Sequence, residues 1–202
     1  MDQQDLVNHL IREGYLKTPR IIQAFLKVDR RFFVLNKGEA YADYPLPIPG
    51  GQTISAPHMV AIMLELLELK KTDTVLEIGA GSGYNAALLS LLTKKVYSIE
   101  FDEVLVAFAK NNLKKAHIKN VVVLQGDGSR GLPGKEFDKI IFTCAVPEIP
   151  EPVVSQLKDP GILLAPVGVG AQDLILLRKD KGSVKEENHG GCVFVPLRTK
   201  PL

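Results

Sequence analysis

The stretch that decides the fold reads Glu77-Ile78-Gly79-Ala80-Gly81-Ser82-Gly83-Tyr84. It joins a short β-branched run, Thr74–Ile78, to apolar residues at helical spacing from Tyr84 to Leu92. Three glycines at every second position let the backbone turn tightly and come close to a ligand. The N–H groups at the start of the following helix are free to bind that ligand. The stretch therefore predicts a strand, a ligand-binding loop and a helix.

The spacing and the charge of this loop favour a cationic adenosyl ligand over a dinucleotide. A dinucleotide-binding loop holds its pyrophosphate with the pattern G-x-G-x-x-G, whereas the pattern here is G-x-G-x-G. Glu77, at the end of the strand, would repel a pyrophosphate and attract an α-amino group or a sulfonium. Taken alone, the loop has an alternative interpretation as a plain turn.

Two further acids each follow a predicted strand. The strand Val96–Ile99 ends at Glu100, where a carboxylate can accept hydrogen bonds from ribose hydroxyls. The strand Val121–Leu124 runs into Asp127, which can accept one from an adenine amine. Each acid alone is more often a solvated or capping residue. Three acids in register predict a ligand in one crevice, because the carboxyl ends of parallel strands meet at one edge of the sheet.

Strands and helices alternate from about residue 75 onward, which predicts a doubly wound, mostly parallel α/β sheet with helices on both faces. The other expected elements are helices at Glu103–Lys115 and Pro152–Leu157 and strands at Lys139–Phe142, Ile162–Val167, Leu174–Leu177 and Cys192–Val195. No helix separates the last two strands, so they could pair as an antiparallel edge.

The first 70 residues follow a different pattern. Leu6–Tyr15 and Pro19–Val28 predict two amphipathic helices. Tyr44–Gly51 is rich in proline and glycine and can be neither helix nor central strand. A helix is predicted again over Ala56–Leu69, with Ser55 as its candidate N-cap.

Length and composition suit one domain over 1–202, with N-terminal helices and a substrate loop in 1–70 and the cofactor-binding sheet and C-terminal strands in 71–202. The chain has 202 residues, 46% of them hydrophobic, and a net charge of +2. The charges are interspersed, which argues against a nucleic-acid binder. No apolar run approaches the roughly 20 residues of a membrane span, and Met1–Asp5 is polar, unlike a signal peptide. A cytoplasmic protein is expected.

Two sets of side chains have an ordinary structural interpretation. Cys144 and Cys192 are expected to be small and buried, although a disulfide between them stays open. A basic run is predicted to be a solvated helix face; it comprises Lys110, Lys114, Lys115 and Lys119.

The segment Asp43–Met59, DYPLPIPGGQTISAPHM, resembles the signature of the protein-L-isoaspartate O-methyltransferases, most of all their archaeal and bacterial members. Further matches follow in order at Gly126–Gly128, Phe137–Ile141, Ala145–Pro150 and Phe194–Leu197. The resemblance implies a Rossmann-like class I methyltransferase fold and S-adenosylmethionine as cofactor. It also implies methyl transfer to the α-carboxylate of isoaspartyl residues in damaged proteins, which begins their repair.

The resemblance also implies roles for single residues. Ser55 would contact the substrate carboxylate, Thr53 and Ile54 lie in the same segment, and the backbone of Val195 would hold the peptide. His58 is a candidate substrate contact, with packing as its alternative. The residues expected around the cofactor are Glu77, Gly79, Gly81, Gly83, Glu100, Asp127 and Gly128. Two features depart from the family: Val60 replaces a second histidine, and the chain ends early, at Pro201–Leu202.

The implied chemistry makes small demands on the protein. A carboxylate is already ionised at neutral pH and needs no general base, so Ser55 is expected to fix the carboxylate by a hydrogen bond. In-line placement of oxygen, methyl and sulfur does the rest. No metal site is predicted, and the expected partners are isoaspartyl proteins and peptides, without nucleic acid or membrane, acted on by a monomer.

Three alternatives remain open at this point: a methyltransferase of the same fold acting on a small molecule or RNA, an NAD-dependent oxidoreductase, and an adenosyl-binding regulator without turnover.

Overall fold

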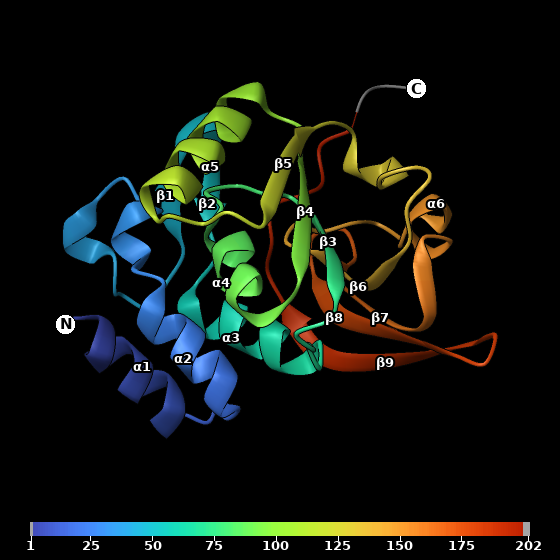
Figure 1. Cartoon of the computed structure of the whole chain (residues 1–202), viewed down its shortest axis with the longest axis horizontal. Coiled ribbons are helices and arrows are strands. Elements are labelled where there is room, and N and C mark those ends of the chain that lie inside the picture. The colour runs from blue at the N-terminus through green and yellow to red at the C-terminus, as the bar shows by residue number, and fades with distance from the viewer. Residues whose placement is uncertain (1, 200–202) are drawn as a thin grey trace.

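The computed structural model describes residues 2–199; Met1 and Lys200–Leu202 lie outside the described residues. Within them, a seven-stranded sheet has the order β5-β4-β3-β6-β7-β8-β9 (Figure 1). Its strands are β3 (Thr74–Ile78), β4 (Lys95–Glu100), β5 (Val121–Gln125), β6 (Phe137–Phe142), β7 (Leu157–Val167), β8 (Gln172–Asp180) and β9 (Ser183–Cys192). The helices are α1 (Gln3–Arg12), α2 (Pro19–Lys27), α3 (Pro57–Leu66), α4 (Tyr84–Leu92), α5 (Glu103–Lys115) and α6 (Glu151–Val154).

The sheet is mostly parallel with an antiparallel edge, as predicted. Strands β3 to β7 pair in parallel, β8 pairs antiparallel with β7, and β9 pairs antiparallel with β8. The chain builds outward from β3 through β4 to β5, then returns to place β6 on the other side of β3. This reversal leaves a crevice beyond the carboxyl ends of β3 and β6, where open α/β sheets bind their ligands.

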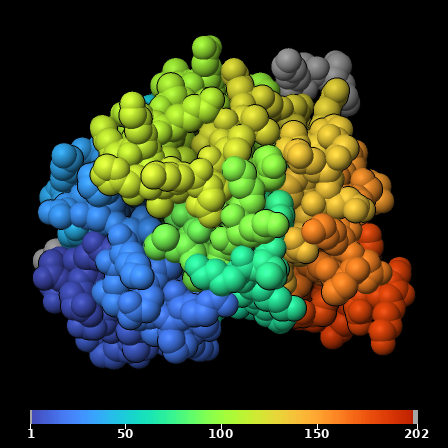
Figure 2. All heavy atoms as spheres, viewed as in Figure 1, coloured from blue at the N-terminus to red at the C-terminus, as the bar shows by residue number. Residues whose placement is uncertain are grey.

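The two faces of the sheet are covered unequally. Alternate strand residues such as Val75 and Ile141 pack against the helices α1 to α5, whereas Leu76 and Ile140 pack on the other face with Val153 of the short α6. Figure 2 shows the N-terminal helices and the β8–β9 hairpin on opposite sides of the molecule. The predicted lysine run lies exposed on and just after α5, and both cysteines are buried and free.

One predicted strand is wrong. The sequence predicts a strand at Cys192–Val195 that could pair with Leu174–Leu177, but the strand that pairs with β8 is Ser183–Cys192. Most of β9 is polar and exposed, so hydrophobic alternation does not reveal it. It is held by a hairpin whose turn residues, Lys181 and Gly182, both have positive φ. Residues after Cys192 leave the sheet and cross toward the crevice.

The proline-glycine segment forms a small hairpin apart from the sheet. Strand β1 (Leu46–Ile48) pairs antiparallel with β2 (Gln52–Ile54), and a 3₁₀ turn, η3 (Pro49–Gly51), joins them. The expected capping role of Ser55 is wrong, because the N-cap of α3 is Ala56, without a side-chain hydrogen bond. Instead, Asp43 accepts from the backbone N–H of His58 at 2.8 Å. The Ser55 hydroxyl is therefore not engaged in capping this helix.

The Gly126-Asp127-Gly128 turn after β5 gives a test of close packing at the crevice. A Cβ added to Gly128 would overlap the Cγ2 methyl of buried Ile78, whereas one on Gly126 would lie 3.6 Å from Ile99, an ordinary contact. Gly128→Ala should lower the free energy of unfolding by about 1–3 kcal/mol, and Gly126→Ala by much less. Urea denaturation of both variants measures the difference, and an equal loss would contradict this account of Gly128.

Candidate active site

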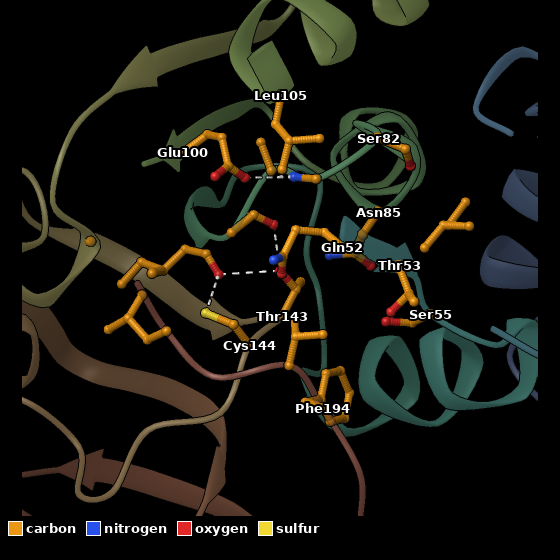
Figure 3. A pocket seen from close by; sticks show the side chains of 18 of the residues that line it. Gln52, Thr53, Ser55, Ser82, Asn85, Glu100, Leu105, Thr143, Cys144 and Phe194 are labelled. Atoms are coloured by element: carbon orange, nitrogen blue, oxygen red, sulfur yellow. Dashed lines mark hydrogen bonds between the residues drawn. The ribbon is translucent and has the colours of Figure 1, made fainter. Parts of the chain in front are cut away.

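A cavity lies beyond the carboxyl ends of β3, β4 and β6. One wall comes from residues 52–55 after the proline-glycine turn, and another from residues 194–198 near the chain end. The glycine loop forms its floor. Figure 3 shows Ser55 and Thr53 on the opposite side of the cavity from Glu100 and Cys144. Three segments far apart in the sequence therefore build one site.

The glycine loop is held by its neighbours in a shape that only glycine adopts readily. Gly79 has φ of 98° and Gly81 of 53°. The Thr143 hydroxyl donates to the Gly79 carbonyl, and a Cβ on Gly79 would lie 2.6 Å from that hydroxyl oxygen. Both glycines line the cavity. The loop can therefore bring its backbone against a ligand without side chains in between.

Glu100 occupies the position that the sequence predicted, at the tip of β4 on the cavity wall. Only 7% of the residue is exposed. One carboxylate oxygen accepts from the Gly81 N–H at 2.9 Å and the other from the Asp102 N–H at 3.1 Å. These bonds fix the carboxylate while leaving lone pairs for hydroxyl donors from a ligand.

Glu77 does not contact the cavity, contrary to its expected place at the cofactor. It is fully buried, and its side chain lies on the helix-covered face of the sheet, where alternation along β3 places it with Val75. Its carboxylate accepts hydrogen bonds from Asn85 at 2.9 Å and from the Ser98 hydroxyl. Burial raises the pKa of Glu77 to about 7, although both hydrogen bonds act in the opposite direction. Asn85 itself lines the cavity, so Glu77 supports the site from below.

Three other predicted residues also lie outside the cavity lining. Gly83 packs against α5, where a Cβ would meet the Ala109 carbonyl at 3.3 Å. Asp127 accepts from the Ser129 N–H at 3.0 Å, while its neighbour Gly128 does line the cavity. His58 Nδ1 lies 2.9 Å from an Asp43 oxygen, which ties α3 to the chain before the hairpin.

The predicted substrate residues Thr53, Ile54, Ser55 and Val195 all line the same cavity. Val195 is held there through the backbone, since its carbonyl accepts from the Ala145 N–H at 2.8 Å. The side chain of Gln172 on β8 adds a second clamp that sequence analysis missed. It accepts from the Phe194 N–H at 2.7 Å and donates to the Phe194 carbonyl at 3.2 Å.

Sequence analysis also missed Arg198 and Thr143, which line the cavity and belong to no recognisable spacing pattern. The guanidinium of Arg198 lies 2.9 Å from Asp102 and 5.7 Å from the centre of the Phe101 ring. This contact ties the C-terminal segment to the loop after β4 at the edge of the cavity.

Comparisons with known proteins agree with this geometry. The sequence profile of the protein-L-isoaspartate(D-aspartate) O-methyltransferase family (PCMT) matches residues 1–201. The chain belongs to this family. Protein-L-isoaspartate O-methyltransferases of Pyrococcus horikoshii and Pyrococcus abyssi are 50% and 52% identical to it, over 98% and 95% of the chain and 96% and 92% of the relatives.

A solved PCMT structure from Plasmodium falciparum, in complex with S-adenosyl-L-homocysteine, superimposes with a TM-score of 0.90 at 26% identity, covering 99% of this chain and 100% of that one. As a member of the PCMT family, the chain is an S-adenosylmethionine-dependent methyltransferase with a Rossmann-like fold. Its cavity suits that cofactor because Gly79 and Gly81 expose backbone that carries no side chain and Glu100 presents an acceptor for hydroxyl donors.

The buried Glu77 predicts a pH-dependent stability. Its pKa in the folded protein, about 7, lies above the ordinary value of 4.5, so the folded state favours the protonated acid. The stability it contributes is fully present below pH 4.5 and is lost as the pH rises through 7. Glu77→Gln should remove this loss. Between pH 5 and pH 8, the free energy of unfolding of the variant should therefore rise relative to that of the wild type by on the order of 2 kcal/mol.

Urea denaturation at the two pH values measures this gain. The exposed neighbour of the site, Glu103, provides the matched control, and Glu103→Gln should follow the wild-type pH profile. Parallel profiles for Glu77→Gln and the wild type would show that the carboxyl is ionised throughout.

Proposed function

We propose that this chain transfers the methyl group of S-adenosylmethionine to the α-carboxylate of L-isoaspartyl residues in damaged proteins, and so begins their repair. The supporting observation is that Ser55 and the family's signature segment line the same cavity as the glycine loop and Glu100. That cavity brings a hydroxyl donor for a carboxylate beside a loop suited to an adenosyl ligand. The Pyrococcus relatives carry the name of this activity over nearly the whole chain.

The lining residues fit a reaction that needs placement more than acid–base chemistry. Bound S-adenosylmethionine supplies an activated methyl group, and a carboxylate is already ionised at neutral pH. The Ser55 hydroxyl donates a hydrogen bond that fixes one carboxylate oxygen. Cys144 is no competing nucleophile, because burial raises the pKa of its thiol well above the ordinary range. Orientation of the two reacting groups is then the main contribution of the protein.

The hairpin β1–β2 keeps water from the reacting groups in this proposal. The Cδ1 methyl of Ile48 lies 3.6 Å from the position of a Cβ on Gly81, so the hairpin packs onto the glycine loop. Next to it, Gly50 approaches Asp102, whose carboxylate oxygen would lie 3.2 Å from an added Cβ. The hairpin therefore covers the loop from the side of Ser55.

The remaining roles extend the same assignment. Glu100 would accept the ribose hydroxyls and Asp127 the adenine amine, with the backbone of Gly79, Gly81 and Gly128 against the cofactor. Thr53, Ile54 and the backbone of Val195 would hold the isoaspartyl peptide. His58 would act through its contact with Asp43, which fixes the start of α3.

We also propose that the enzyme works as a cytoplasmic monomer on isoaspartyl proteins and peptides. Its two free, buried thiols fit a reducing compartment. Between residues 2 and 199, no helix is both long and apolar enough to cross a membrane.

The first test of the proposal is substrate choice. With radiolabelled S-adenosylmethionine, the protein should methylate an isoaspartyl peptide and leave its aspartyl isomer unlabelled, because only the isoaspartyl linkage offers an α-carboxylate in that position. Label on both peptides, or on neither, would contradict the proposed substrate.

The second test concerns Ser55. Ser55→Ala should lower kcat on the isoaspartyl peptide by roughly 10- to 100-fold, since the carboxylate loses its orientation. Affinity for S-adenosylhomocysteine, measured by calorimetry, should stay near the wild-type value. The exposed Ser155 at the end of α6 offers a control, and Ser155→Ala should retain full activity. Wild-type turnover in Ser55→Ala would remove the serine from the site.

A further inference from the structure

Arg30 is an unusual charge in this protein. It begins the 3₁₀ turn η1 (Arg30–Phe32), and only 1% of it is exposed. Its Nη2 donates to the Ser55 carbonyl at 3.0 Å, and its guanidinium carbon lies 4.9 Å from the centre of the Tyr84 ring. The other two nitrogens, Nε and Nη1, are buried without a hydrogen-bond partner, and they are the only such side-chain atoms within residues 2–199.

Asp29, the neighbour of Arg30 in the chain, and Asp43, whose charge acts on Arg30, both contact other groups. Asp29 pairs with Arg31 at 2.7 Å and accepts from the Tyr41 hydroxyl at 2.8 Å. Asp43 is held by His58 at 2.9 Å, with His9 on its other oxygen at 3.5 Å.

In the described part of the chain, no carboxylate lies within 4.0 Å of the Arg30 guanidinium. Burial lowers the pKa of Arg30, but an arginine side chain remains charged in proteins. The protein therefore buries a cation with no carboxylate in direct contact, although Tyr84 and the charge of Asp43 partly offset the effect of burial on its pKa.

A buried charge without a partner is expensive, so its position needs an explanation. Arg30 lies behind the cavity wall, in contact with two residues that line the cavity, Ser55 and Tyr84. An anion bound at the Ser55 hydroxyl would be separated from the guanidinium by that one residue. Arg30 and the anionic substrate would then lie on opposite sides of Ser55, the guanidinium at its carbonyl and the anion at its hydroxyl.

We propose that Arg30 is a positioning residue that supplies the counter-charge for the substrate's carboxylate and fixes the backbone of Ser55. This inference rests on the proposed function and assigns a further residue to it. An isoaspartyl carboxylate bound at the Ser55 hydroxyl would interact with this charge across Ser55, without direct contact.

The charge balance of the reaction decides which kinetic constant Arg30 controls. A carboxylate oxygen forms a bond to the methyl carbon while the methyl–sulfur bond breaks, its electron pair stays on sulfur, and no proton moves. The anion becomes a neutral ester. The field of Arg30 therefore favours the bound substrate over the transition state and the product, so it lowers KM without raising kcat.

The test compares Arg30→Gln, which can still donate to the Ser55 carbonyl, with Arg30→Lys, which keeps the charge. Arg30→Gln should raise KM for the isoaspartyl peptide at least tenfold, or about 1.4 kcal/mol, with kcat within threefold of the wild type. Arg30→Lys should stay within threefold in KM. Affinity for S-adenosylhomocysteine should be unchanged in both variants.

Two outcomes would overturn the counter-charge. One is an unchanged KM in Arg30→Gln. The other is an equal rise in KM in Arg30→Gln and Arg30→Lys together with weaker binding of S-adenosylhomocysteine, which would show a purely structural role. A wild-type enzyme that fails to methylate the isoaspartyl peptide would instead overturn the proposed function, so the two failures are distinct.

A measurement on the wild type keeps the test open if Arg30→Gln does not fold. In the presence of S-adenosylhomocysteine, where no turnover occurs, calorimetry compares the isoaspartyl peptide with its α-carboxamide analogue. The carboxamide keeps the shape and loses the charge, and it should bind at least tenfold more weakly. Equal affinity would overturn the inference.

Discussion

The site depends on the close approach of two strand ends, β3 and β6, at Gly79. There the backbone has φ of 98°, and the Thr143 hydroxyl occupies the space beside it, so a side chain at this position would meet both a conformational and a steric penalty. The strand order reverses between the same two strands, and the crevice that results is where the glycine loop is exposed. Glu100 then fixes the loop from the neighbouring strand.

The other two walls are brought to this loop from both ends of the chain, and each is held by side chains outside the cavity lining. Asp43 fixes the first turn of α3, so the segment before it, with Ser55, is held against the loop. At the other end, the Gln172 amide clamps Phe194 and the Ala145 N–H binds the Val195 carbonyl. Placement to within a hydrogen-bond length is what a reaction governed by orientation requires.

Sequence patterns predicted the elements whose residues repeat at a regular spacing and failed where tertiary context decides. The strands of the parallel sheet and the helices α4 and α5 follow hydrophobic periodicity, and Glu100 could be placed because parallel strands end together. Strand β9 escaped because its side chains are polar and exposed. Glu77 lies outside the cavity lining because the pleat, not the spacing, decides which face a strand-end side chain meets. Arg30 and Gln172 reach the site through contacts remote in sequence, and the single-domain division at residue 70 stays a prediction.

Methyl transfer from a sulfonium to a carboxylate removes two opposite charges, which constrains where the protein can place its own. An ion pair in direct contact with either reactant would stabilise the separated charges most and so oppose their loss. Two almost fully buried ionisable residues, Glu77 beside the glycine loop and Arg30 behind Ser55, lie outside the cavity lining. In the proposed complex, neutral groups such as the Ser55 hydroxyl and the loop backbone would contact the reacting groups, while the Glu100 carboxylate would accept from the ribose hydroxyls. In this proposal the charge of Arg30 attracts the carboxylate from beyond the lining, without a direct ion pair that the methyl transfer would have to break.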